Sequence, residues 1–224
     1  MIRALAALLL AAGAVTAEPI NRIDPTELDG RLSGWMDFET LPLLPEPGLS
    51  HDAPLLAPGL ALGERFVGQS LDGAPHDRLE GAPSAPLSLA ATKPGEGQST
   101  AYHAGFGSIA LFPLGPAGFP AVEARGEGAV ALLFATDITA LALTLHADYA
   151  DPLGTRPLPG TATLNFYDRS GGLIDRHEIT LGTGPLPLAF QSTGPGFAGV
   201  TLTNDDPGGL AVDDIRYPLA GFGS

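Results

Sequence analysis

Short apolar runs that alternate with polar residues, each cut off by glycine or proline, restrict the fold of this chain more than any other feature. In residues 138–147 every second side chain is apolar and would share one face of a strand: Leu141, Leu143, Leu145 and Ala147. The 30 glycines and 22 prolines interrupt such runs throughout, and helical periodicity is hard to find. Strict alternation is typical of antiparallel sheets with one buried face. The chain is therefore predicted to be all-β, an antiparallel two-sheet β-sandwich of jelly-roll type with about ten to twelve strands.

One sandwich domain is expected over residues 34–217, because no repeat or linker divides that stretch. Residues 1–17 indicate a signal peptide, since a short apolar stretch follows Arg3 and small residues precede the cleavage site after Ala17. The alternative, a hydrophobic core strand, is disfavoured by Pro19. Residues 18–33 are expected to form an exposed lead-in with one helical turn, and residues 218–224 a tail. A secreted or periplasmic protein without membrane insertion is predicted.

The same pattern places the individual strands. In the first half they are expected at residues 34–41, 65–71, 86–91, 108–112 and 121–125, with a proline-rich loop over 42–62. In the second half they are expected at residues 128–135, 138–147, 161–168, 173–181, 187–191, 199–204 and 210–217. A tight turn at Thr136-Asp137 should join the first two strands of the second half.

The charge balance narrows the range of partners. Lys and Arg total 11 against 25 Asp and Glu, which gives a formal net charge of −14, and Lys93 is the only lysine. Because no basic patch is visible, binding to nucleic acid or to an anionic membrane surface is not expected. The chain has no cysteine, so an exported domain of this kind would depend on a large core or a metal ion rather than on disulfides.

Acidic side chains stand among apolar ones in the first and the last expected strands. Asp37 and Glu39 follow Trp35, and Asp213 and Asp214 are neighbours near the C-terminus. By alternation Asp213 shares the more apolar face, and Asp214 points to the opposite one. A buried carboxylate is costly unless it is neutralised, and a calcium ion, which takes about six to eight oxygens, would join the two strands. Glu39 and Asp213 are the favoured ligands, with Asp37 and Asp214 as second choices; the alternative is that solvent, backbone N–H groups or an arginine satisfies them.

A family resemblance rests on these short stretches: Asp37-Phe38-Glu39, Gly63-Glu64-Arg65-Phe66-Val67-Gly68, and Gly199-Val200-Thr201-Leu202-Thr203-Asn204 leading into Ala211-Val212-Asp213-Asp214-Ile215. With them, residues 34–217 resemble exported bacterial β-sandwich domains of the kind found in PEP-CTERM proteins. That group is similar in outline to galactose-binding-like jelly rolls and carbohydrate-binding modules. In some of those modules a Glu on the first strand and an Asp on the last share a structural calcium. The resemblance implies fold more than function, and the sorting tail is expected to be absent.

Motifs for catalysis do not occur in the sequence. It contains neither Gly-x-Ser-x-Gly nor His-Glu-x-x-His, and without cysteine it has no thiol nucleophile. A glycosidase would need two carboxylates about 5–10 Å apart, usually beside several aromatic residues, but the chain has one Trp and four Tyr. No enzymatic activity is therefore expected. Tyr102, His103 and Tyr149 could form a small ligand-contacting surface, although packing in the core or the loops is the commoner role for such residues.

These observations favour an exported, non-catalytic binding module for glycan or cell-surface material, with a structural calcium and with its contacts in loops. One alternative is a structural or matrix protein that assembles with itself. The clear alternation and the net charge of −14 argue against uncontrolled self-association. A more distant alternative is a polysaccharide hydrolase.

Overall fold

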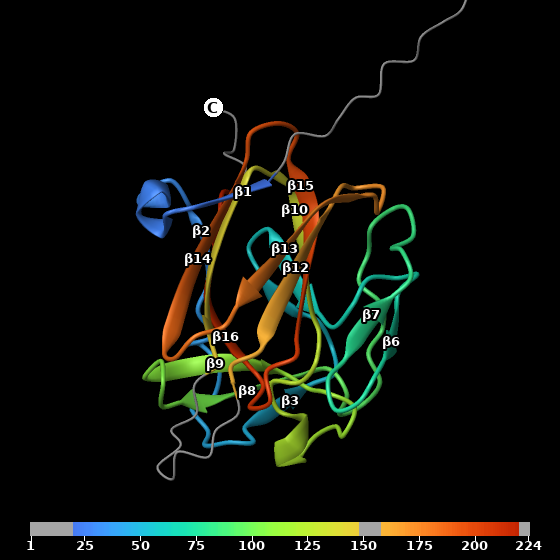
Figure 1. Ribbon diagram of the computed structural model, residues 1–224, viewed down its shortest axis with the longest axis vertical. Coiled ribbons are helices and arrows are strands. Elements are labelled where there is room, and N and C mark those ends of the chain that lie inside the picture. The colour runs from blue at the N-terminus through green and yellow to red at the C-terminus, as the bar shows by residue number, and fades with distance from the viewer. Residues whose placement is uncertain (1–19, 148–157, 220–224) are drawn as a thin grey trace, which may run out of the picture.

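The computed structural model describes residues 20–147 and 158–219 and folds them into two antiparallel sheets that pack face to face (Figure 1). These residues hold sixteen strands and two short 3-10 helices, and none of their helices is long and apolar enough to cross a membrane. The predicted antiparallel β-sandwich is therefore confirmed. The strand count exceeds the expected number of about ten to twelve. The expected signal peptide lies outside the described residues.

Sheet A has eight strands in the order β1-β14-β11-β16-β9-β8-β3, and β2 also pairs with β16. Its strands are β1 (Ile20–Ile23), β2 (Gly34–Met36), β3 (Leu49–His51), β8 (Gln98–His103), β9 (Ser108–Pro113), β11 (Ala140–His146), β14 (Pro185–Ser192) and β16 (Ala211–Tyr217). The first expected strand does lie beside the last, since Gly34 is opposite Tyr217 and Met36 is opposite Ile215. A Cβ atom at Gly34 would lie 2.4 Å from the Tyr217 ring, so this pairing requires glycine.

Sheet B has six strands in the order β13-β12-β15-β10-β5-β4, and a separate hairpin is formed by β6 and β7. These strands are β4 (Leu55–Ala57), β5 (Leu60–Gly63), β6 (Ser70–Asp72), β7 (Arg78–Glu80), β10 (Val130–Ile138), β12 (Thr161–Tyr167), β13 (Leu173–Thr180) and β15 (Phe197–Asn204). The 3-10 helices are η1 (Pro25–Leu28) and η2 (Val122–Ala124). The hairpin of β6 and β7 lies to one side of the sandwich (Figure 1).

The main core lies between the two sheets and is rich in aromatic rings. Phe166 packs against Phe197 with ring centroids 5.1 Å apart, and Phe197 packs in turn against Phe134 at 6.0 Å. Leu141, Leu143 and Leu145 point into the same core, as their alternation predicts. Burial of this apolar surface is the main favourable contribution to folding.

The first half of the chain departs from the sequence-based expectations. The expected exposed lead-in over residues 18–33 is corrected, because Ile20 is buried and β1 near its start pairs with β14. The expected loop over 42–62 contains β3, β4 and β5, and there Leu62 faces the core. The segments 65–71 and 86–91 pair through an isolated bridge between Phe66 and Leu89 rather than as regular strands, and β6 begins at Ser70.

Three further boundaries differ from the predictions. The strand expected at 34–41 ends at Met36, because Phe38 has a positive φ of 61°. The strand expected at 121–125 is the 3-10 helix η2. The turn expected at Thr136-Asp137 lies inside β10, whose last residue, Ile138, pairs with Phe197 after a register shift.

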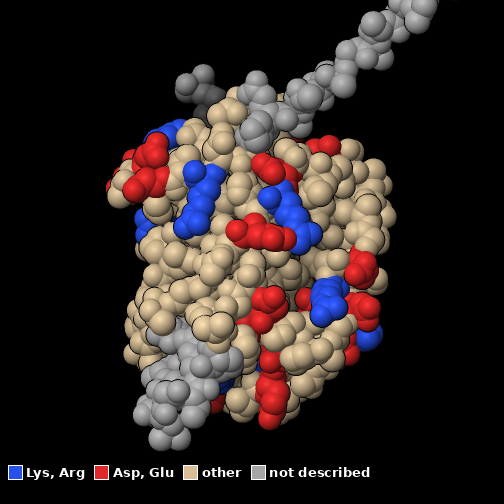
Figure 2. Space-filling model, viewed as in Figure 1, with Lys and Arg blue, Asp and Glu red and all other residues tan. Residues whose placement is uncertain are grey.

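The face that carries β12 and β13 is shown in space-filling form in Figure 2. Acidic and basic side chains are interspersed there among uncharged ones, so this face has no patch of a single sign. The acidic excess of the chain is therefore not concentrated on it.

Candidate functional site

A hollow of about 420 Å³ lies where β2, β11 and β16 meet the turn before β9. All four carboxylates singled out in the sequence line it: Asp37, Glu39, Asp213 and Asp214. The rest of the lining comes from Trp35, Phe106, Gly107, Ser108, Thr144 and Pro185. The structure thus brings the predicted residues of both end strands to one place.

A bulge in β16 makes this convergence possible. Thr144 lies opposite Asp213, whereas Ala142 lies opposite Arg216, so three steps along β16 match two along β11. Asp214 lies within this bulge, and its φ of 57° is in the left-handed region. The expectation that Asp213 and Asp214 point to opposite faces is corrected, because this bulge allows both side chains to line the same hollow.

Protein donors reach all four carboxylates, and those of Asp214 come from Trp35 and Arg216. The Ser108 hydroxyl donates to Asp213 Oδ2 at 2.7 Å, and the Asp214 N–H donates to Asp213 Oδ1 at 2.7 Å. The backbone N–H of Ile109 donates to Glu39 Oε1 at 2.8 Å, and the N–H of Glu39 donates to Asp37 Oδ1 at 3.2 Å. The backbone N–H contacts agree with the alternative in which such groups satisfy the carboxylates, and the Ser108 hydroxyl is an additional donor that the alternative did not include.

Asp213 is buried, as its alternation predicted. Burial raises the pKa of this carboxyl to about 6, against the opposing effect of its two hydrogen bonds, and the charges of Asp214 and Glu39 raise it further. A calcium ion would relieve that cost, and each Asp213 oxygen accepts one hydrogen bond and so retains a lone pair. However, no three acidic or histidine side chains in the described part of the chain are grouped closely enough to hold a metal ion. The calcium site therefore stays a prediction.

Trp35 is the exposed aromatic side chain at the rim of this hollow. Its indole N–H donates to Asp214 Oδ1 at 2.8 Å, and the Arg216 guanidinium lies 4.9 Å from the ring centre. Arg216 also donates to Asp214 Oδ1 at 3.2 Å. The indole is thus held at its edge and on one face, while 53% of the residue stays exposed.

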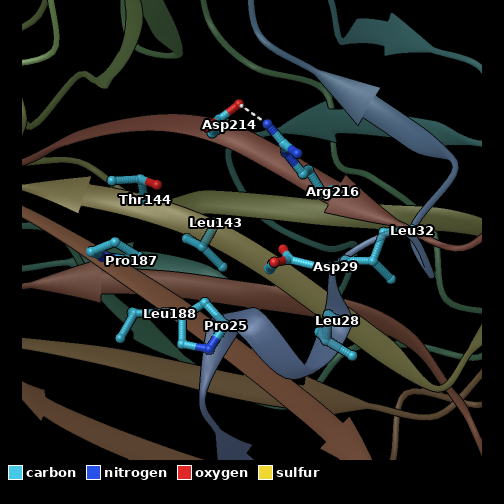
Figure 3. A pocket seen from close by; sticks show the side chains of 12 residues that line it. Pro25, Leu28, Asp29, Leu32, Leu143, Thr144, Pro187, Leu188, Asp214 and Arg216 are labelled. Carbon is cyan, nitrogen blue, oxygen red and sulfur yellow. Dashed lines mark hydrogen bonds and ion pairs between the residues drawn. The ribbon is translucent and has the colours of Figure 1, made fainter.

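A second hollow of about 220 Å³ adjoins the first, because both are lined by Thr144 and Asp214. Its floor is more apolar and includes Leu28, Pro187 and Leu188, with Arg216 at the rim (Figure 3). Asp24 and Glu27 form a capping box at η1, the helix that carries Leu28. We call the two hollows together the Trp35 groove.

The other residues proposed from the sequence do not form one contact surface. Tyr102 is exposed on β8, but His103, its neighbour, is buried on the opposite face against Phe106 and Phe112. A hydrogen bond of 2.7 Å links His103 Nε2 to His146 Nδ1, and burial lowers the pKa of His103 to about 4. The assignment of His103 as a ligand contact is therefore corrected. Tyr149 lies outside the described residues.

Sequence reasoning missed two features of the groove. Trp35 was placed on the first strand but was not assigned to ligand contact, although its exposure makes it the most accessible aromatic group here. Ser108 and Thr144 had no sequence signal, because single hydroxyl residues in strands are common. Ser108 and Thr144 come together only because β2, β9 and β11 all pair with β16.

Comparisons with known proteins add little to this geometry. No family model matches the chain, and no curated protein matches it, so the resemblance to PEP-CTERM-associated domains stays a prediction. Among solved structures, a mutant of a family 29 carbohydrate-binding module complexed with mannohexaose is similar over 74% of this chain and 85% of that chain, with a TM-score of 0.33 and 11% identity. At this TM-score the two backbones differ too much for residues or ligands to be carried over.

Proposed function

We propose that this protein is a non-catalytic glycan-binding module whose ligand lies in the Trp35 groove. The observation that carries this proposal is an exposed indole, fixed by Asp214 and Arg216, beside a hollow lined with carboxylates and hydroxyls. A pyranose ring has an apolar C–H face and a rim of hydroxyl groups. The free indole face suits the C–H face, and the carboxylate oxygens suit the hydroxyl donors.

The charge of the groove favours neutral glycans. Asp37, Glu39, Asp213 and Asp214 line the first hollow, and Arg216 is the cation that lines the second. An acidic sugar would place its own carboxylate among these groups, where like charges repel. Polymers of neutral hexoses or pentoses are therefore the favoured class.

The size of the groove favours an oligosaccharide over a single sugar. The hollows of about 420 and 220 Å³ meet at Thr144 and Asp214. The first hollow alone lies within the range of about 300–1,000 Å³ that is common for ligand sites, and the second extends it. In a chain of several sugars, one sugar would contact Trp35 and another would contact the apolar floor around Leu28 and Leu188.

The test is isothermal titration calorimetry with hexasaccharides of glucose, mannose and xylose and with hexagalacturonate as the acidic member. We expect binding of at least one neutral chain, and we expect Trp35→Ala to weaken it at least tenfold. Tyr102→Ala is the matched control, because Tyr102 is an exposed aromatic residue outside the groove. Loss of binding in Tyr102→Ala with retention in Trp35→Ala would move the site elsewhere. Absence of binding to every chain would reject the proposal.

A second candidate function at the same place is calcium binding. Glu39 and Asp213 come from separate segments that meet at this hollow, and the charge of Glu39 contributes to the raised pKa of Asp213. Thermal unfolding with millimolar calcium or with a chelator tests it, because a ligand at one hundred times its dissociation constant adds about 2.7 kcal/mol. We expect the stabilisation to disappear in Glu39→Gln and Asp213→Asn. No difference between calcium and chelator in the wild-type protein would reject calcium and leave the glycan proposal standing.

A further inference from the structure

A separate cavity of about 250 Å³ shares no lining residue with the Trp35 groove. It lies between the β6–β7 hairpin and the segments around Lys93 and Leu114. Its charged lining residues are Glu64, Asp72, Asp77, Glu96 and Lys93. We call it the Glu64 cavity. Four carboxylates against one ammonium group leave its walls with an excess of negative charge.

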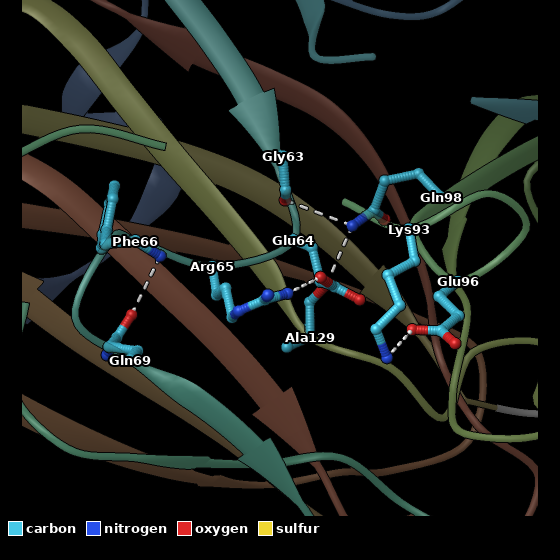
Figure 4. A network of polar contacts seen from close by, with 9 residues as sticks. All are labelled: Gly63, Glu64, Arg65, Phe66, Gln69, Lys93, Glu96, Gln98 and Ala129. Atoms are coloured by element: carbon cyan, nitrogen blue, oxygen red, sulfur yellow. Dashed lines mark hydrogen bonds and ion pairs between the residues drawn. The ribbon is translucent and has the colours of Figure 1, made fainter. Parts of the chain in front are cut away.

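Glu64 is the central group of this cavity. The residue is only 1% exposed, and its Oε2 atom pairs with the Arg65 guanidinium (Figure 4). Its Oε1 atom is buried and has no hydrogen-bond partner among the residues that the structure describes. Figure 4 shows this second oxygen on the side of Lys93 and Glu96, away from Arg65. A buried carboxylate oxygen without a donor is costly, and it indicates a missing partner.

Asp77 provides a second buried carboxylate in the same cavity, with 5% of the residue exposed. Burial raises the pKa of its carboxyl to about 6, against the smaller lowering effect of a backbone hydrogen bond at Ala129. Burial likewise raises the pKa of Glu64 to about 7 despite the adjacent Arg65 charge. Both groups would therefore gain from an additional positive charge in the cavity.

The rim of the cavity already holds one ammonium group. Lys93 Nζ pairs with Glu96 Oε2 at 3.1 Å, and the Lys93 side chain is largely exposed (Figure 4). A divalent metal fits less well, because the described residues contain no three acidic or histidine side chains grouped closely enough to hold one. An ammonium group needs only about three acceptors and no fixed coordination shell, and 250 Å³ is far more space than a bare ion fills.

We infer that the Glu64 cavity binds the primary ammonium group of a small organic ligand, such as an amino sugar or an aliphatic amine, through Glu64 Oε1 and the Asp77 carboxylate. The Glu64 side chain supplies the acceptor that has no partner, and Asp77 supplies the second charge. The lining of this cavity includes none of the Trp35 groove, so the inference does not rest on the proposed function.

The test measures stabilisation and binding of the full chain at pH 7.5 in phosphate buffer with a chelator. The probes are putrescine and glucosamine, with 1,4-butanediol and glucose as their neutral counterparts and sodium chloride added to equal ionic strength. We expect the two amines to raise the melting temperature, the neutral compounds not to, and Glu64→Gln to weaken amine binding at least tenfold by calorimetry. Glu178→Gln is the matched control, because it removes an equal charge from an exposed site on β13.

Three results would overturn the inference. Equal effects of putrescine and sodium chloride would show screening alone. Unchanged binding in Glu64→Gln would place the amine elsewhere. In a separate melt without chelator or phosphate, stabilisation by calcium that depends on Glu64, with no response to either amine, would make the cavity a metal site instead. Circular dichroism of Glu64→Gln verifies that the variant is folded, and Asp77→Asn repeats the test from the second carboxylate.

Discussion

Replacing Glu64 by glutamine should stabilise the protein at pH 8 but not at pH 4.5. Burial raises the pKa of this carboxyl from its ordinary value of 4.5 to about 7. The folded protein therefore keeps the proton in a pH range where the unfolded chain has released it, and the free energy of unfolding falls as the pH rises through that range. Each pKa unit corresponds to about 1.36 kcal/mol, so the buried charge costs about 3 kcal/mol above pH 7. Glutamine keeps the shape and removes that charge.

The assay is urea unfolding followed by far-ultraviolet circular dichroism between pH 4.5 and pH 8, in buffers free of amines and divalent ions. The quantity of interest is the free energy of unfolding of Glu64→Gln minus that of the wild type. We expect this difference to grow by about 3 kcal/mol across the range, whereas the difference for the exposed Glu178→Gln should stay within about 0.5 kcal/mol. A flat difference for Glu64→Gln would refute the reasoning, because it would mean that water or a donor already solvates the carboxylate.

Three other predictions concern the core and the buried histidine. Phe166→Ala should lower the free energy of unfolding by about 3–5 kcal/mol in a urea titration, because Phe166 is fully buried among other rings; a loss below about 1 kcal/mol would show that the core collapses around the gap. Tyr217→Phe should cost about 1 kcal/mol, since its hydroxyl donates to the Pro58 carbonyl at 2.7 Å, and an unchanged unfolding midpoint would contradict this. Burial lowers the pKa of His103 to about 4. Its contribution to the free energy of unfolding should therefore be fully present above about pH 6.5 and should be lost as the pH falls towards 4. An NMR titration in which every imidazole titrates near about pH 6.5 would contradict this.

The sequence predicted the second half of the fold better than the first, for a physical reason. Strands such as β12 carry apolar side chains at every second position, so the period itself marks them. β8 begins with Gln98, Ser99 and Thr100, which are buried although they are polar. Burial of such residues depends on hydrogen bonds to distant segments, for example from Gln98 Nε2 to the carbonyls of Gly63 and Ala129. A local pattern contains no information about those partners.

The candidate site shows the same division. Alternation of apolar and polar residues correctly predicted that Asp213 is buried, and the acidic residues among apolar ones marked both end strands as a possible site. It could not indicate the bulge at Asp214, because an αL residue in a strand is fixed by the register of its neighbours rather than by its own type. It also gave no reason to single out Glu64, which is buried beside Arg65 in a segment that lacks regular strand pairing.

The position of β16 has a consequence for how the chain acquires this structure. β16 lies between β11 and β9, so the segment 211–217 separates sheet A into β1-β14-β11 on one side and β9-β8-β3 on the other. A chain still in synthesis that has not yet released this segment from the ribosome has two half-sheets with open edges and no strand to join them. Closure must then wait for contacts between residues far apart in sequence, such as Gly34 with Tyr217, and folds dominated by such contacts form slowly. Until β16 is added, the unpaired edges of both half-sheets can pair with those of another chain, so the nascent protein is prone to aggregation.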